Sequence, residues 1–194
     1  FREIRESTKY EHVVAFANAL PAIRAKVRQH MRLRGLPREK ILATVVHLLE
    51  TTLIRVGNDD YAKQNNSYGL TTLKNRHVNL KGDRVRFSFR GKHGIHHDVE
   101  IADPRVAKVL RGCLDLPGQQ LFEYVDENGS VRDVTSSDVN EYLREITGEP
   151  YTAKDFRTWH ATCEMLELLT GRQLHGRHAV PALVRALRAH LCRD

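Results

Sequence analysis

The chain has 194 residues, which is enough to form one large domain or two small ones around a buried core. Its 41% hydrophobic and 28% charged residues exclude a disordered chain and are typical of a globular protein. The formal net charge is +7, and residues 114–150 hold only two of the 31 basic residues but nine of the 24 acidic ones. The rest of the chain is therefore strongly basic, which favours a phosphate-rich partner because neutralised phosphates release counterions. Charge alone fits an ordinary basic protein equally well.

Cysteine and histidine usage gives no metal motif. The three cysteines are Cys113, Cys163 and Cys192. Their wide spacing favours free thiols in a reducing compartment over disulfides. His93, His96 and His97 gather near a predicted hairpin tip, but Asp98 is the only acidic residue beside them, so we expect no metal site there. No signal peptide or transmembrane run is recognisable, and we expect a cytoplasmic protein.

Apolar residues recur at helical spacing through the first part of the chain. The pattern predicts helices from Tyr10 to Leu20, from Pro21 to about Leu33, and from Pro37 to Arg55. We place Pro21 at the start of the second helix because proline suits a first helical turn. The third helix has a wide apolar face, which predicts a central position. The polar residues 58–69 predict a loop.

From Leu73 the pattern changes to alternation with a period of two. The segments HVNL, RVRFSFR and IHHDVEI alternate between apolar and polar residues, and KGD and GKHG separate them. This pattern predicts a three-stranded antiparallel meander with tight turns at Gly82 and Gly94. Lys92 then lies at the tip of the second turn.

The remaining chain returns mainly to helical patterns. We expect a helix from Pro104 to before Pro117, a short extended piece at 121–125, and helices over 135–146 and from Thr152. Residues 181–191 predict an arginine-rich amphipathic helix. The predicted fold class is therefore α+β, mainly helical with one small three-stranded antiparallel sheet.

Three basic side chains occupy conspicuous places in this layout. Arg55 ends an apolar helix before Gly57, Lys92 lies at a hairpin tip, and Arg157 precedes the single tryptophan by two residues. Each has an ordinary explanation: a cation at a helix C-terminus, a solvated turn lysine, and a surface ion pair with Asp155. Together they suggest more, because two arginine forks can bind phosphate oxygens while an ammonium protonates a leaving alkoxide. Such a set needs no metal ion to stabilise the transition state.

Four segments together resemble one known family. They are LLETTLIRVGNDDYAKQNNSYGLTTLKNRHV, FSFRGKHGIHHDVEI, LPGQQLFEYVDENG and YTAKDFRTWHAT. In this order they are similar to the catalytic domain of type IB DNA topoisomerases, of the bacterial and poxvirus branch, over residues 1–162. The resemblance implies a catalytic core with a helical part (1–57), a sheet-containing part (70–102) and a second helical part (103–162). We expect residues 163–194 to form a divergent, arginine-rich helical segment.

The resemblance also implies a reaction and a set of residues. In this family a tyrosine attacks a backbone phosphate to form a 3′-phosphotyrosyl link, and the strand is later resealed without metal or ATP. Arg55, Lys92 and Arg157 match the first catalytic arginine, the general acid and the second arginine. Four further matches are supporting or DNA-binding residues: Lys154, Tyr61, Lys74 and His77. The implied partner is duplex DNA, with no cofactor and no membrane, and we expect a monomer at the nucleoid.

Two features depart from the family. The N-terminal β-rich domain has no counterpart before Phe1, and all six tyrosines precede Arg157, so we expect this chain to lack the nucleophile. A duplex-binding module without chemistry therefore remains an alternative. A tyrosine recombinase is a third possibility, but recombinases usually carry histidine three residues before the second arginine. Here Lys154 occupies that place, which favours the topoisomerase.

Overall fold

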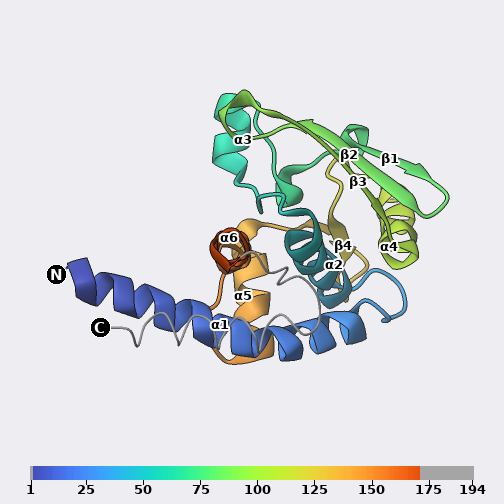
Figure 1. Cartoon of the computed structure of the whole chain (residues 1–194). Coiled ribbons are helices and arrows are strands. Elements are labelled where there is room, and N and C mark those ends of the chain that lie inside the picture. Colours follow the sequence, from blue (N-terminus) through green and yellow to red (C-terminus); the bar gives the residue numbers. More distant parts are fainter. Residues whose placement is uncertain (1, 171–194) are drawn as a thin grey trace.

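The computed structural model describes the backbone of residues 2–170 and the side chains of residues 11–168. In this part of the chain a helical group surrounds α2, and a small sheet lies on the side of α2 away from α1 (Figure 1). The helices are α1 (Arg2–His30), α2 (Arg38–Thr52), α3 (Asp59–Asn65), α4 (Pro104–Leu114), α5 (Ser136–Thr147) and α6 (Ala153–Thr170). The strands are β1 (Val78–Lys81), β2 (Arg84–Arg90), β3 (His96–Ala102), β4 (Glu123–Val125) and β5 (Val131–Asp133). The predicted α+β class is confirmed.

The first two predicted helices are one. Helix α1 continues through Pro21, so the prediction of a helix start there is wrong. Pro21 is exposed, whereas Leu20 and Ile23 on either side of it are buried in the same core. The apolar face therefore continues past the proline, and packing outweighs the one backbone hydrogen bond that proline removes.

Helix α2 is the centre of the helical group. It contacts α1, α4, α5 and α6, and nine of the ten residues from Lys40 to Leu49 are buried. The predicted central position is confirmed, but the helix ends earlier than expected. Leu53 takes the left-handed conformation (φ 59°) and is 38% exposed, so Arg55 lies in an extended segment beyond the helix.

Residues 59–65 form a short helix, α3, where the sequence predicted a loop. Helix α3 begins at Asp59 because the side chain of Asn58 accepts a hydrogen bond from the backbone N–H of Tyr61 at 2.9 Å. Asparagine is among the best residues at this capping position, which explains how a polar segment forms a turn or two of helix.

The predicted meander is confirmed. Strands β1, β2 and β3 pair antiparallel in that order, with Phe87 opposite Val78 and Val99. Val85, Phe87 and Phe89 are buried while the alternate residues of β2 are exposed, so one face of the sheet packs on the core with α4. Both predicted turn glycines have a positive φ, 58° at Gly82 and 76° at Gly94.

The later helices begin at side-chain caps. The side chains of Asp103 and Thr135 accept hydrogen bonds from N–H groups in the first turns of α4 and α5. Asp155, in the first turn of α6, accepts one from the N–H of Thr152, the residue just before that helix. The predicted extended piece is the first strand of a two-stranded hairpin, β4–β5. The predicted helix over 181–191 lies outside the described residues. Among the helices described, none is both long and apolar enough to span a membrane.

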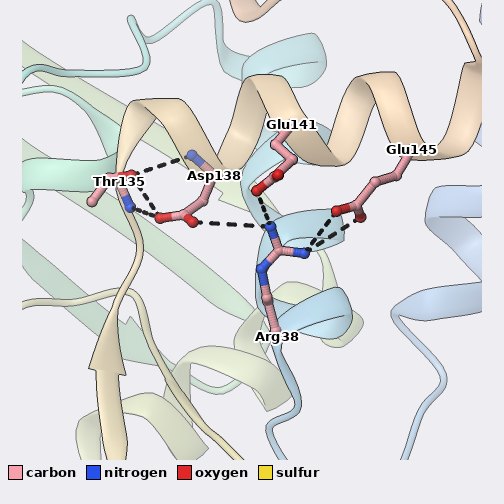
Figure 2. A network of polar contacts seen from close by, with 5 residues as sticks. All are labelled: Arg38, Thr135, Asp138, Glu141 and Glu145. Carbon is pink, nitrogen blue, oxygen red and sulfur yellow. Dashed lines mark hydrogen bonds and ion pairs between the residues drawn. The ribbon is translucent and has the colours of Figure 1, made fainter.

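A single arginine joins the start of α2 to α5. Arg38 forms ion pairs with Glu141 at 3.0 Å, Glu145 at 3.3 Å and Asp138 at 3.9 Å, all on one face of α5 (Figure 2). Asp138 also accepts hydrogen bonds from Thr135 and thereby caps the same helix. The acidic segment of the sequence is thus partly neutralised by an arginine of the same chain, which links α5 to the central helix.

Candidate active site

Arg55 and Arg157 come together where α2 ends and α6 begins. Arg157 lies on α6 and donates a hydrogen bond from Nη1 to the carbonyl oxygen of Leu53 at 2.8 Å. Burial lowers the pKa of Arg157, and the positive charge of Arg55 lowers it further. The Arg157 guanidinium thus lies against the segment that carries Arg55, and the two like charges disfavour each other, which favours an anion beside them.

The ordinary explanations for the two arginines do not hold. Asp155 does not pair with Arg157, because its carboxylate contacts His12 at 2.9 Å and the backbone N–H of Thr152 at 2.8 Å. Within the described part of the chain, neither Arg55 nor Arg157 has a carboxylate partner. Arg55 is also exposed and three residues past the last residue of α2, so it does not cap that helix.

Lys92 lies at the exposed end of the β2–β3 hairpin. The turn is closed by a hydrogen bond from the backbone N–H of Gly91 to the carbonyl oxygen of Ile95, at 2.7 Å. A Cβ atom at Gly91 would collide with the ring of His97, which itself stacks on Phe89. The tip that carries Lys92 is therefore held by packing as well as by backbone hydrogen bonds.

Backbone contacts join this hairpin to the segment that carries Arg55. The N–H of Tyr68 donates to the carbonyl oxygen of Arg90 at 2.8 Å, and the N–H of Leu70 donates to that of Arg55 at 2.8 Å. In Figure 1 the tip of β2–β3 and helix α3 lie at the same end of the sheet, above α6. The segment from Tyr68 to Leu70 thus joins the Arg55 segment to the hairpin that carries Lys92.

Two supporting residues predicted from the sequence flank this region. Lys154 is exposed and lies one turn before Arg157 on α6, so the two side chains share a face of that helix. Tyr61 lies in the first turn of α3 and is 37% exposed. Both side chains are accessible to a ligand that reaches Arg55 and Arg157.

Lys74 and His77 lie in a different setting. His77 is only 9% exposed, its Nδ1 accepts a hydrogen bond from the backbone N–H of Lys74 at 3.0 Å, and its ring packs on Tyr68 with centroids 4.5 Å apart. Burial, followed by the charges of Arg76 and Lys74, lowers the pKa of His77. The structure therefore places His77 largely beneath the surface, where its ring nitrogens contact the backbone N–H of Lys74 and the side chain of Arg76.

Sequence reasoning missed the contribution of residues 68–72. Thr71 and Thr72 are 4% and 2% exposed, and both hydroxyl groups hydrogen-bond to neighbouring backbone. The pair Thr71 and Thr72, shortly after Gly69, could have indicated this contribution, because buried hydroxyl groups need backbone partners.

Helix α6, which carries Arg157, contains no tyrosine. Tyr142 and Tyr151 are buried. Burial, with nearby carboxylates as a second cause, raises the pKa of both hydroxyl groups. A raised pKa disfavours the phenolate that would attack phosphorus. The same part of the chain contains no group of three or more His, Cys, Asp or Glu residues arranged to hold a metal ion.

Comparison with known proteins identifies the class of protein. The family model described as "Eukaryotic DNA topoisomerase I, catalytic core" matches residues 1–193. The chain belongs to this family, that of the type IB DNA topoisomerase catalytic cores, as its motifs predicted. The match also includes residues 163–193, which lie beyond the resemblance seen in the sequence.

The relatives are viral and eukaryotic. DNA topoisomerase 1B of Acanthamoeba polyphaga mimivirus is 26% identical over 84% of this chain and 50% of its own length. DNA topoisomerase 1 of Schizosaccharomyces pombe is 29% identical over 83% of this chain and 19% of its own length. DNA topoisomerase I of monkeypox virus is 40% identical over 43% of this chain and 28% of its own length. The chain thus spans half or less of the curated relatives that it matches, and the bacterial part of the predicted branch stays a prediction.

Proposed function

We propose that this chain is the part of a type IB topoisomerase that binds duplex DNA and activates one backbone phosphodiester. Arg55 and Arg157 would each bind non-bridging oxygens of the same phosphate and stabilise the charge that develops on five-coordinate phosphorus. Lys92 would donate a proton to the departing 5′ oxygen. Lys154 and Tyr61 would contact the DNA next to that phosphate, and His77 would position Lys74 against the backbone.

One observation carries this proposal. The Arg157 guanidinium donates a hydrogen bond to the carbonyl oxygen of Leu53, two residues before Arg55. Burial and then the positive charge of Arg55 lower the pKa of Arg157, and no carboxylate in the described part of the chain pairs with either arginine. Folding two like charges together without a counter-ion is unfavourable, so such pairs are typical of anion sites. Phosphate geometry suits arginine forks, which favours a phosphodiester over a small carboxylate.

The complete reaction would be relaxation of supercoiled duplex DNA through a 3′-phosphotyrosyl intermediate, with neither metal nor ATP. It needs a tyrosine, and no tyrosine follows Tyr151 in the sequence. The buried hydroxyl groups of Tyr142 and Tyr151, whose pKa is raised by burial, favour a second candidate, a duplex-binding module that binds a phosphate without cleaving the strand. Membership of the topoisomerase family and Lys154 in place of histidine argue against a recombinase. A monomer at the nucleoid of the cytoplasm remains our expectation.

A nicked duplex that traps covalent intermediates separates the two candidates. We expect duplex binding that weakens steeply with salt, and no covalent protein–DNA adduct on a denaturing gel. An adduct would show that one of the six tyrosines acts as the nucleophile and would favour cleavage. Failure to bind duplex DNA at any salt concentration would contradict both candidates.

A further inference from the structure

The position of Arg55 is set by a neighbouring segment and not by helix α2. Leu53 leaves the helical conformation, so the residues after it have no helical hydrogen bonds. The carbonyl oxygen of Arg55 accepts from the N–H of Leu70 at 2.8 Å. The carbonyl oxygen of Val56 accepts two hydrogen bonds from Thr71, from the N–H at 2.7 Å and from Oγ1 at 2.9 Å. Thr71 is thus the residue with two hydrogen bonds to the Arg55 segment.

The same segment contacts the hairpin that carries Lys92. Tyr68 donates its N–H to the carbonyl oxygen of Arg90, two residues before Lys92. Four residues, Tyr68 to Thr71, therefore contact both the Arg55 segment and the base of the hairpin. Leu70–Thr72 form one turn of 3-10 helix, so the stretch is shorter than the roughly 14 Å that four extended residues span, and it sets the spacing between the two segments directly.

The junction is close-packed and backbone to backbone. A Cβ atom at Gly69 would lie 2.6 Å from the carbonyl oxygen of Arg55 and from the N and Cα atoms of Gly57. The N–H of Gly69 donates to Oγ1 of Thr72 at 2.9 Å, and residues 69–72 are all buried. Such a junction transmits a displacement, because close-packed backbone has little room to adjust.

We propose that Thr71 is a positioning residue for the phosphodiester site. Its hydroxyl group holds the Val56 carbonyl, and the segment from Tyr68 to Thr71 thereby fixes Arg55 relative to Lys92. This inference rests on the proposed function, since it assigns to Thr71 the placement of a group that binds phosphate. Valine has nearly the shape of threonine, so Thr71→Val removes the hydroxyl with little change in packing, and Thr71→Ser keeps it.

The test observes the guanidinium signals directly. In ¹⁵N–¹H spectra, the Nε–Hε peaks of Arg55 and Arg157 are assigned from their loss in Arg55→Lys and Arg157→Lys. We expect duplex DNA to shift both peaks in the wild-type chain. In Thr71→Val the Arg157 shift should persist while the Arg55 shift is reduced or lost, and Thr71→Ser should restore it. Thr44→Val is the matched control: Thr44 is also buried, but its hydroxyl bonds to Lys40 within α2, so both shifts should remain.

The outcomes are distinguishable. If neither arginine peak shifts when duplex DNA binds the wild-type chain, the proposed function fails. If both shift and Thr71→Val leaves the Arg55 shift unchanged, the positioning role of Thr71 is wrong while the proposed function stands. Should Thr71→Val not fold, a folded Thr71→Ser chain that loses the Arg55 shift would also refute the role of the hydroxyl group.

Discussion

Arg157 donates a hydrogen bond to the carbonyl oxygen of Leu53 across 104 residues of sequence. This bond joins the C-terminal end of α2 to α6 and satisfies a carbonyl that no longer has a helical partner. It also fixes the guanidinium of Arg157 beside the segment where Arg55 emerges. The end of α2 therefore serves both the stability of the helix and the geometry of the candidate site.

The left-handed conformation of Leu53 predicts an unusually small cost for a glycine substitution. A non-glycine residue at φ 59° carries a steric cost that glycine does not. The Leu53 side chain is only 38% exposed, so Leu53→Gly loses packing as well as the steric cost, and we expect the free energy of unfolding in urea to fall by about 1 kcal/mol less than in a matched variant without a positive φ. Leu33 is 39% exposed and has no positive φ, so Leu33→Gly is that matched variant. A decrease in Leu53→Gly equal to that control would contradict the argument.

We expect Arg55 to contribute little to the affinity for duplex DNA. Many basic side chains share the electrostatic attraction to duplex DNA, so we expect Arg55→Ala to weaken binding by no more than about threefold at physiological salt. Fluorescence anisotropy with a labelled duplex measures this, with Arg84→Ala on the exposed sheet face as the control. Complete loss of binding in Arg55→Ala would mean that Arg55 supports the fold or the whole interface.

The Arg38 network should contribute measurably to stability. One half-buried guanidinium with three carboxylates is a network and not an isolated surface pair, so we expect Arg38→Met to lower the free energy of unfolding by about 1–2 kcal/mol. In the control, Arg84→Met, the lost partner is Glu100, and both side chains of that pair are mostly exposed. Arg84→Met should change the free energy of unfolding by no more than about 0.5 kcal/mol. Equal effects in the two variants would show that the network adds nothing.

Asp103 predicts a particular loss of stability in acid. Burial alone would raise its pKa, but hydrogen bonds from the side chain and N–H of Arg105 and from the N–H of Val106 outweigh it and lower the pKa to about 2. The folded pKa is below the unfolded value of 3.8, so the contribution is present above about pH 4 and is lost as the pH falls through 2. We expect Asp103→Asn to remove about 2 kcal/mol of this pH-dependent stability.

Urea unfolding between pH 2 and pH 5 checks the prediction for Asp103. The decline of the unfolding free energy with falling pH should be shallower in Asp103→Asn than in the wild-type chain. Asp83→Asn is the control, because the Asp83 carboxylate is 63% exposed and 3.9 Å from its nearest cation, Arg111. If Asp103→Asn and the wild-type chain have parallel pH curves, the Asp103 carboxylate does not contribute as described.

Much of the fold follows from local pattern. The alternation in RVRFSFR predicts the buried face of β2, and the caps at Asp103 and Thr135 predict where α4 and α5 begin. The failures have non-local causes. Helix α1 runs through Pro21 because its two halves bury one continuous face, and α2 ends before Arg55 because Leu53 turns out of the helix and its carbonyl bonds to α6.

For the candidate site, too, local sequence pattern predicts some features and non-local contacts determine the others. Sequence motifs single out Arg55, Lys92 and Arg157, and the structure places them through contacts that no local pattern contains. The repulsion between two arginines depends on the packing of α6 against α2. The burial of His77 depends on Tyr68, nine residues earlier, whose ring covers it. The role of Thr71 depends on the pairing of two segments, neither of which is part of a strand.

The long separation between Leu53 and Arg157 has a consequence for biosynthesis. A chain emerging from the ribosome carries Arg55 early, but its companion arginine arrives only with α6. Until that last described helix packs against α2, Arg55 has no second guanidinium beside it. The pair of arginines proposed to bind phosphate therefore forms only when folding is nearly complete, and not when either segment is synthesised.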